Sequence, residues 1–164
     1  MELGLIDVVN KDDKVIATKE RLKVKNNEIV RVTGIFILNN KNEILLQKRA
    51  AQSFKYPNHW DCSAGGHVDS GESYNICANR ELFEEIGIKT KLEFLGKDYF
   101  KLPDGRHHFI SSYKGTYNKE FKLDKTEVSD VQFFSFEQIK ELIKNKEKIH
   151  PGCLFALEKY IFSN

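Results

Sequence analysis

The sequence has few cysteines, few prolines and no long apolar run. Its three cysteines, Cys62, Cys77 and Cys153, are odd in number, far apart and without a CxxC pair, which argues against a disulfide framework or a zinc site of thiolates. No apolar run approaches the roughly 20 residues that a membrane-spanning helix needs. The first residues also lack the basic-then-apolar layout of a signal peptide. These absences predict a reduced, cytoplasmic protein without membrane segments.

An excess of charge of one sign is also lacking. The 26 lysine and arginine residues nearly balance the 24 aspartate and glutamate residues, which leaves a net charge of +2. No strong field therefore points to nucleic acid or to an anionic membrane as a partner. Internal repeats and Pro/Gly/Ser-rich linkers are absent too, and 164 residues are enough for one domain with a core but too few for two independent enzymatic domains.

What is present is a mixture of strand and helix patterns in no repeating order. Strands are expected at residues 5–9, 14–18, 30–38, 43–48, around 62–64, 91–95, 109–117 and 131–134. Helices are expected at 72–86, 136–144 and 152–162, the first closed by Gly87 and the second opened by Ser135. The first two strands form a hairpin around a polar turn. This mixture predicts an α+β protein, or a mixed sheet flanked by helices.

Carboxylates gather on the first expected helix, after the glycine pair Gly65-Gly66. Glu81, Glu84 and Glu85 fall within a wedge of about 100° on one face. The opposite side holds the apolar residues Ile76, Leu82, Phe83 and Ile86. Like charges this close repel one another, and several convergent carboxylates are what Mg²⁺ binds in proteins. The cluster therefore indicates a divalent metal site, and a solvated glutamate face is the alternative.

The same stretch resembles a known motif. Gly66, Glu72 and the run Arg80-Glu81-Leu82-x-Glu84-Glu85-x-Gly87-Ile88 reproduce the spacing of the Nudix box, with every defined position filled. The resemblance covers roughly residues 28–162. It implies the Nudix fold, a mixed β-sheet sandwiched between helices, with an N-terminal β-hairpin extension. Residues 1–27 would form the extension and residues 28–164 the Nudix hydrolase domain, within a single structural domain.

For function, the resemblance implies a metal-dependent pyrophosphohydrolase that cleaves a diphosphate bond in a nucleoside diphosphate derivative or a related small molecule, with Mg²⁺ or Mn²⁺ as cofactor. Carried over by position, Glu84 and Glu85 would be metal ligands and Glu81 a third ligand or the base. The backbone carbonyl of Gly66 would complete the site. The metal would offset diphosphate charge and lower the pKa of bound water. Many members of the family are dimers, so a homodimer is one assembly that the resemblance implies.

Supporting residues are predicted inside and outside the box. Arg80 resembles the box arginine that orients a glutamate by ion pairing, and Glu72 resembles the residue that braces the loop against the helix. Many Nudix enzymes add an acidic residue from outside the box. Glu127 is the first candidate for this role and Glu120 the second, and a surface-loop glutamate is the alternative for both.

Three further residues are predicted to contact the substrate. Arg49 ends a strand beside the site and would grip a phosphate with two donors. Gly65 lies next to the metal-binding backbone, and Trp60 would form an aromatic wall for a base or another apolar group. A surface role for Arg49 and a structural role for Trp60 stay open. Loops of this kind set the substrate, so the fold does not choose it.

Two other functions remain as alternatives. The N-terminal hairpin and residues 60–68 resemble the isopentenyl-diphosphate isomerase-like branch, which isomerises an allylic diphosphate by proton transfer. Such isomerases place a cysteine where this chain has Gly65, with Cys62 three positions earlier. They also hold a metal with N-terminal histidines and one that matches His67, whereas no histidine here precedes His59. A catalytically inactive nucleotide sensor would usually lack box carboxylates. The intact box therefore favours the hydrolase.

Overall fold

The computed structural model describes residues 4–163 of the chain, and its centre is the long strand β3 (Ile29–Leu38). This strand pairs antiparallel with β1 (Leu5–Val9), β4 (Ile44–Arg49) and β6 (Ala64–His67), and parallel with β8 (His107–Thr116). The remaining strands pair with these: β2 (Val15–Glu20) with β1, β5 (Trp60–Asp61) and β9 (Val128–Phe134) with β4, and β7 (Glu93–Lys101) with β8. The result is one mixed sheet.

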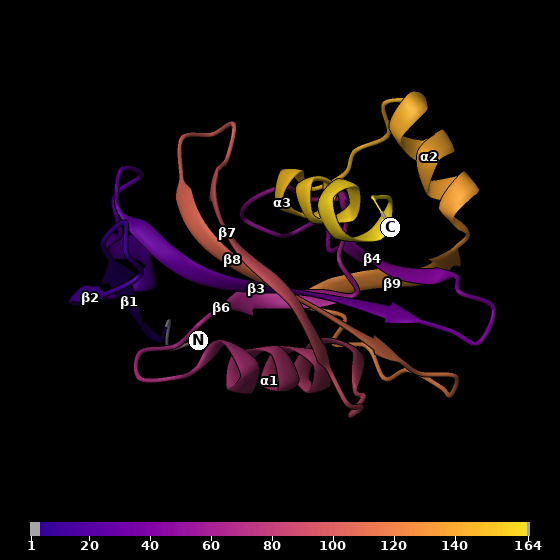
Figure 1. Cartoon of the computed structure of the whole chain (residues 1–164), viewed down its shortest axis with the longest axis horizontal. Coiled ribbons are helices and arrows are strands. Elements are labelled where there is room, and N and C mark those ends of the chain that lie inside the picture. The colour runs from indigo at the N-terminus through magenta and orange to yellow at the C-terminus, as the bar shows by residue number, and fades with distance from the viewer. Residues whose placement is uncertain (1–3, 164) are drawn as a thin grey trace.

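Helices cover both faces of this sheet (Figure 1). Helix α1 (Tyr74–Ile86) lies on one side, and α2 (Phe136–Lys144) and α3 (Pro151–Ala156) lie on the other. The alternation of side chains along β3 supplies both cores. Ile35 and Ile37 belong to the core beneath α1, whereas Phe36 belongs to the core beneath α2 and α3. The predicted α+β class, with a mixed sheet sandwiched between helices, is confirmed.

Local signals in the sequence placed most helix ends correctly. Ser135 caps α2 in a capping box with Gln138, and Gly87 ends α1 in the left-handed conformation with φ of 73°. Helix α1 begins two residues later than expected, because the side chain of Ser73 caps it by accepting a hydrogen bond from the Ile76 N–H. The last helix continues from α3 into a π-helical turn, Leu157–Ile161.

Strand lengths were predicted less well. The strand expected at 91–95 extends to Lys101, because β7 pairs along its length with β8. The strand expected around 62–64 is instead two short strands, β5 and β6, on either side of Cys62 and Ser63. A short 3-10 helix, η1 (Arg21–Lys23), was not expected.

The orientation of α1 differs from the predicted amphipathic helix. Ile76 and Phe83, expected on the apolar face, are 61% and 51% exposed, whereas Glu85 is only 6% exposed. Leu82 and Ile86 are buried as expected. The prediction assumed that charged residues face water. Here the carboxylate of Glu85 faces the sheet, where the protein supplies hydrogen-bond donors for it.

The N-terminal hairpin is attached to the rest of the fold by two buried aspartates. Asp7 accepts hydrogen bonds from the hydroxyl groups of Thr18 and Ser70, at 2.8 and 2.7 Å, and from the Gly71 N–H at 3.3 Å. Ile6 and Val8 of the hairpin are buried against Val30 of β3. The hairpin therefore extends the central sheet. The division at residues 27 and 28 stays a prediction.

The second aspartate, Asp13, lies at the turn of the hairpin. It accepts hydrogen bonds from Arg31 Nε and Lys97 Nζ, each at 2.7 Å, and from the Tyr74 hydroxyl at 3.0 Å. Its partners come from β3, β7 and α1. One side chain thus joins the hairpin turn to three other elements.

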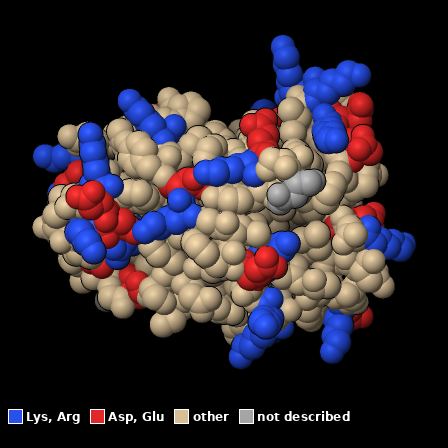
Figure 2. Space-filling model, in the orientation of Figure 1, with Lys and Arg blue, Asp and Glu red and all other residues tan. Residues whose placement is uncertain are grey.

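The surface carries both signs of charge. On the face shown in Figure 2, lysine and arginine side chains lie among aspartate and glutamate side chains, without a broad field of one sign. Within residues 4–163, no helix is both long and apolar enough to cross a membrane.

Candidate functional site

The site is built where β6 passes beside α1. The N–H of Gly65 donates a hydrogen bond to Oε2 of Glu85 at 3.0 Å, and Nε2 of Gln47 donates to the same oxygen at 2.7 Å. A Cβ atom on Gly66 would lie 2.2 Å from Oε1 of Glu81, and one on Gly65 would lie 2.4 Å from the carbonyl oxygen of Thr33. Gly66 therefore leaves room for the Glu81 side chain of α1, and Gly65 allows the close approach of β6 to β3.

Arg80 holds the outer side of this arrangement. Its Nε and Nη2 donate to the two oxygens of Glu72 at 2.8 and 2.9 Å, and its Nη1 donates to Glu81 at 3.0 Å and to Glu84 at 3.2 Å. The hydrogen bonds to Glu72 raise the pKa of Arg80, so the guanidinium stays charged. The structure thus brings Arg80, Glu72, Glu81 and Glu84 together, and Glu84 is the most exposed of them, with 56% of its side chain accessible.

The electrostatics of the inner carboxylates are unfavourable without a cation. Desolvation, which the charge of Arg80 only partly offsets, raises the pKa of Glu81 to about 7. Desolvation and the charge of Glu81 raise the pKa of Glu85 well above its usual value. The charge of Glu127 raises both pKa values further. Glu81, Glu85 and Glu127 therefore form one interacting group of carboxylates.

Glu127 reaches this group through the segment that follows β8. The N–H groups of Lys122 and Asp124 donate to the carbonyl oxygens of Ile86 and Glu85 at the end of α1, at 3.0 and 2.9 Å. This contact fixes the loop that leads to Glu127 beside the helix. The charge of Glu127 acts on both inner carboxylates.

The donor set fits a hard divalent cation. Oxygen ligands, carboxylates above all, suit Mg²⁺ and Mn²⁺. Within residues 4–163, Oε1 of the buried Glu85 and Oε2 of Glu81 accept no hydrogen bond, so each has a lone pair free for a ligand bond. A cation would also relieve the repulsion that raises the two pKa values.

Two of the predicted substrate residues have protein partners. Nη1 of Arg49 lies 3.1 Å from Oδ2 of Asp61, and Nε of Arg49 donates to the Lys55 carbonyl oxygen at 3.2 Å. The ring of Trp60 packs edge-on against Phe134, with 5.0 Å between the ring centres. Trp60 thus packs against the core beneath α2 and α3. This contact agrees with a structural role for Trp60.

A second group of side chains lies around the turn between β7 and β8, and sequence reasoning missed its contacts. The turn between β7 and β8 rises on the α3 side of the sheet (Figure 1). There Nε and Nη2 of Arg106 bind Asp104 at 3.0 and 2.9 Å, and the Arg106 guanidinium lies 5.9 Å from the ring centre of Tyr56. Tyr56 also packs on His150, the N-terminal cap of α3, with 4.7 Å between the rings. These residues come from distant segments, so local sequence gave no signal for them.

The surroundings of His67 are cationic. Its ring packs against His108 with 5.7 Å between the centres. Desolvation lowers its pKa well below the usual value, and the charges of Arg21, Arg106 and Arg49 act in the same direction. Burial likewise lowers the pKa of His108 to about 3.

Two buried cysteines and an aspartate bring potential metal-ligand atoms together on the side of the sheet that α3 covers. Oxygen and sulfur atoms of Asp61, Cys62 and Cys153 lie within 4.8 Å of one another. Arg49 already neutralises Asp61, and burial raises the pKa of Cys153, so its thiol stays protonated. We interpret Cys62 and Cys153 as packing residues.

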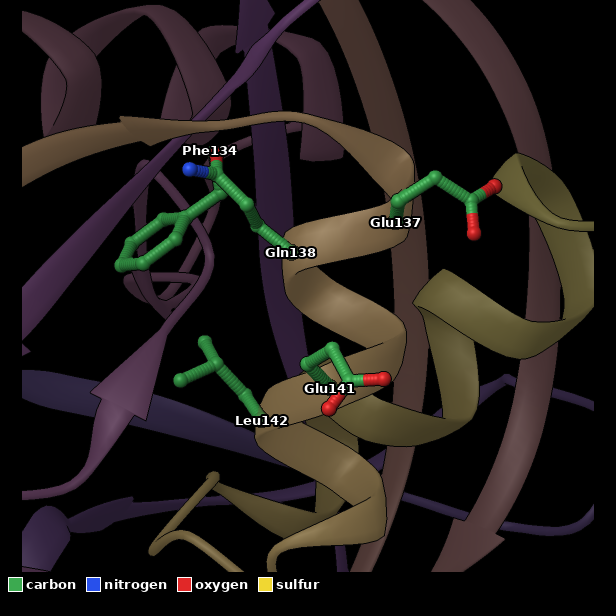
Figure 3. A pocket seen from close by; sticks show the side chains of 5 residues that line it. All are labelled: Phe134, Glu137, Gln138, Glu141 and Leu142. Carbon is green, nitrogen blue, oxygen red and sulfur yellow. The ribbon is translucent and has the colours of Figure 1, made fainter.

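A shallow hollow of about 340 Å³ lies elsewhere, against α2 (Figure 3). Its lining residues are Phe134, Glu137, Gln138, Glu141 and Leu142. It contains none of the carboxylates from α1, so it is separate from the candidate site.

Comparison with known proteins places this geometry in a family. The NUDIX domain matches residues 28–155. A prenyl-diphosphate phosphatase from Methanosarcina mazei is 30% identical, over 96% of this chain and 100% of its own. Isopentenyl-diphosphate Delta-isomerase 2 from Photorhabdus laumondii is 27% identical, over 89% of this chain and 85% of its own. The crystal structure of DR0079 from Deinococcus radiodurans has a TM-score of 0.86 at 21% identity and covers 96% of this chain and 99% of its own.

Proposed function

Since the chain belongs to the Nudix family, we propose that it hydrolyses a diphosphate bond in a small molecule, such as a nucleoside diphosphate derivative, with Mg²⁺ or Mn²⁺. The observation that carries this proposal is the group of carboxylates Glu81, Glu85 and Glu127, whose repulsion the protein itself leaves uncompensated. Structural carboxylates are usually paired with a cationic side chain. Arg80 pairs with Glu81 but only partly offsets the cost of its burial, and among residues 4–163 Glu85 has no cationic partner, so these carboxylates point to a metal-dependent reaction.

Each side chain has a role in the proposed reaction. Glu81, Glu84, Glu85 and the carbonyl oxygen of Gly66 would hold the metal ion. A bound divalent cation neutralises diphosphate charge and lowers the pKa of a water molecule. Arg80 fixes Glu81 through the ion pair already described, and Glu72 fixes Arg80.

The charge of Glu127 acts on the inner carboxylates, and its side chain is solvent-exposed, so it can exchange protons with water. We assign it as a further ligand or as the base that takes a proton from the attacking water. Glu127→Gln should therefore reduce turnover, and Glu120→Gln, the matched change on the same segment, should not. If the two variants were equally active in a steady-state assay, Glu127 would be a surface-loop glutamate without a role in the reaction.

The isomerase alternative has little support at Gly65. A side chain there would collide with the carbonyl oxygen of Thr33, so the backbone has no room for the cysteine that the isomerases use at this position. Cys62 is fully buried beside Cys153, and its pKa is raised. A buried, protonated thiol does not offer the thiolate that proton transfer would need.

A substrate panel distinguishes these functions. The protein would be incubated with Mg²⁺ and nucleoside diphosphates, nucleoside triphosphates, nucleotide sugars, dinucleoside polyphosphates and prenyl diphosphates, and the products identified by mass spectrometry. We expect cleavage of a diphosphate bond in at least one class. Binding without cleavage would support the sensor, and a rearranged allylic diphosphate would support the isomerase.

A further inference from the structure

Strand β7 is an open edge of the central sheet. Within residues 4–163 it pairs with β8 alone, so the other side of its nine residues carries backbone N–H and C=O groups without a strand partner. Such an edge can pair with a strand of another chain. Two aromatic residues of β7, Phe94 and Tyr99, are 57% and 46% exposed. The edge therefore offers main-chain donors and acceptors together with apolar surface.

The two exposed rings project from the same face of the sheet. In the pairing with β8, Phe94 lies opposite Tyr113 and Tyr99 lies opposite Phe109. Residues directly opposite each other share a face, and so do residues four apart on one regular strand. The ring centres are 5.6 Å apart in the first pair and 5.8 Å apart in the second. Because a neighbouring ring already holds each exposed ring, little side-chain freedom is lost when a partner covers it.

The spacing of the two aromatic residues makes β7 complementary to itself. The register with β8 shifts between Phe94 and Gly96, so Leu95 is an extra residue in β7. Phe94 and Tyr99 consequently lie two pairing positions from Lys97, one on each side. If β7 of a second copy lies antiparallel, with a two-fold axis at Lys97, Phe94 of each copy lies opposite Tyr99 of the other. The four exposed rings then cover one another in two cross-strand pairs.

The charges on this part of β7 permit such pairing. Lys97 and Asp98 are the charged residues between the two aromatic positions. Nζ of Lys97 lies 2.7 Å from Oδ2 of Asp13, and Asp98 accepts hydrogen bonds from Lys159 and Tyr160. Both charges are thus compensated within their own chain. Two copies therefore meet at the axis without uncompensated charges of the same sign.

We propose that the β7 edge is the contact surface of a homodimer, in which the central sheets of two copies join into one sheet across a two-fold axis at Lys97. A second copy is the occupant because it presents an aromatic ring opposite each exposed ring and brings no unpaired charge. The resemblance to the Nudix family implies a homodimer as one assembly but assigns no surface to it. The inference is independent of the proposed function, since it concerns none of the carboxylates of α1.

Sedimentation equilibrium of the full chain, from about 1 µM to about 1 mM, tests the dimer. We expect the mass of the wild type to rise with concentration from 19.0 kDa toward twice that value. Phe94→Glu and Tyr99→Glu each place a charge against an apolar ring of the partner, so the dissociation constant should rise about 30-fold or more. The control is Phe83→Glu, which changes a 51% exposed aromatic residue on α1 and should leave the dissociation constant unchanged.

A charge exchange tests the register. The double variant Phe94→Glu/Tyr99→Lys places opposite charges across the axis, so it should dimerise more tightly than Phe94→Glu alone. Within one chain the two side chains are four pairing positions apart, about 13 Å, which is too far for them to pair with each other. Circular dichroism checks that each variant is folded.

Three results would overturn the proposal. A wild type that stays monomeric over the whole concentration range would leave the β7 edge to another occupant, such as an extended peptide of a different protein. A dimer that neither single variant weakens would have its interface elsewhere on the molecule. If the double variant dimerised no better than Phe94→Glu, the pairing about Lys97 would be wrong.

Discussion

At the scale of single residues, the site depends on a buried carboxylate that the protein solvates with its own donors. Glu85 takes hydrogen bonds from Gly65 and Gln47 on one oxygen. Gly65 directly precedes Gly66, the first residue of the recognisable box, so the sequence predicted that it lies at the site. Gln47 belongs to β4, far away along the chain, and is the first of three polar residues at the end of that strand. Its neighbours Lys48 and Arg49 are only partly buried, so nothing in the sequence signals that Gln47 faces the core.

Gln47→Met should weaken metal binding. The change keeps the approximate volume and removes the N–H that holds Glu85 in place, and loss of such an outer contact typically costs 10- to 100-fold in metal affinity. The measurement is the Mg²⁺ concentration at half-maximal turnover, with Gln132→Met on the exposed side of β9 as control. An unchanged Mg²⁺ requirement would mean that Gln47 has only a packing role.

The raised pKa of Glu81 predicts how the stability of the metal-free protein depends on pH. Its pKa is about 7 in the folded protein against 4.5 in the unfolded chain, so the folded protein binds the proton more tightly. The free energy of unfolding should therefore fall as the pH rises from about 4.5 to about 7.

Thermal unfolding in EDTA across this window measures the effect. We expect Tm to fall with rising pH in the wild type, to fall less steeply in Glu81→Gln, and to recover when Mg²⁺ is added, because the cation replaces the proton. If Tm depended on pH equally in wild type and Glu81→Gln, the raised pKa of Glu81 would not be the cause of the pH dependence.

At the scale of elements, short-range signals determine where helices end, whereas long-range contacts determine helix orientation and strand length. The caps Ser135 and Gly87 act within a few residues, so the sequence predicted them. The inward rotation of Glu85 on α1 could not be predicted from periodicity, because it depends on donors from β4 and β6. The same limit hid η1 and the full length of β7, which are set by pairing with other segments.

The hairpin turn offers a test at this scale. Asp13 has φ of 58°, a conformation that Asn also tolerates, so Asp13→Asn removes the charge without new backbone strain. Because its partners Arg31 and Lys97 would lose a mostly buried carboxylate, we expect a loss of about 2–4 kcal/mol in the free energy of unfolding. Denaturant unfolding measures it, with Asp12→Asn, an exposed neighbour, as control. Equal stability of the two variants would show that the turn is held by backbone contacts alone.

At the scale of the whole molecule, the box motif predicted the family and hence the layers of the fold, and the structure bears out the mixed sheet between helices. The motif also marked Gly66, Arg80 and the glutamates of α1. It did not reveal the contact of Arg106 with Tyr56, since these residues come from the β7–β8 turn and from the segment after β4.

The central claim is that the buried carboxylates of α1 support metal-dependent cleavage of a diphosphate bond. The most direct test follows phosphate release by ³¹P NMR for wild-type protein and Glu85→Gln, each with and without Mg²⁺, on the best substrate from the panel. We predict Mg²⁺-dependent cleavage by the wild type and a loss of about 10²- to 10⁴-fold in Glu85→Gln, with unchanged circular dichroism. Cleavage by folded Glu85→Gln at the wild-type rate would contradict the account.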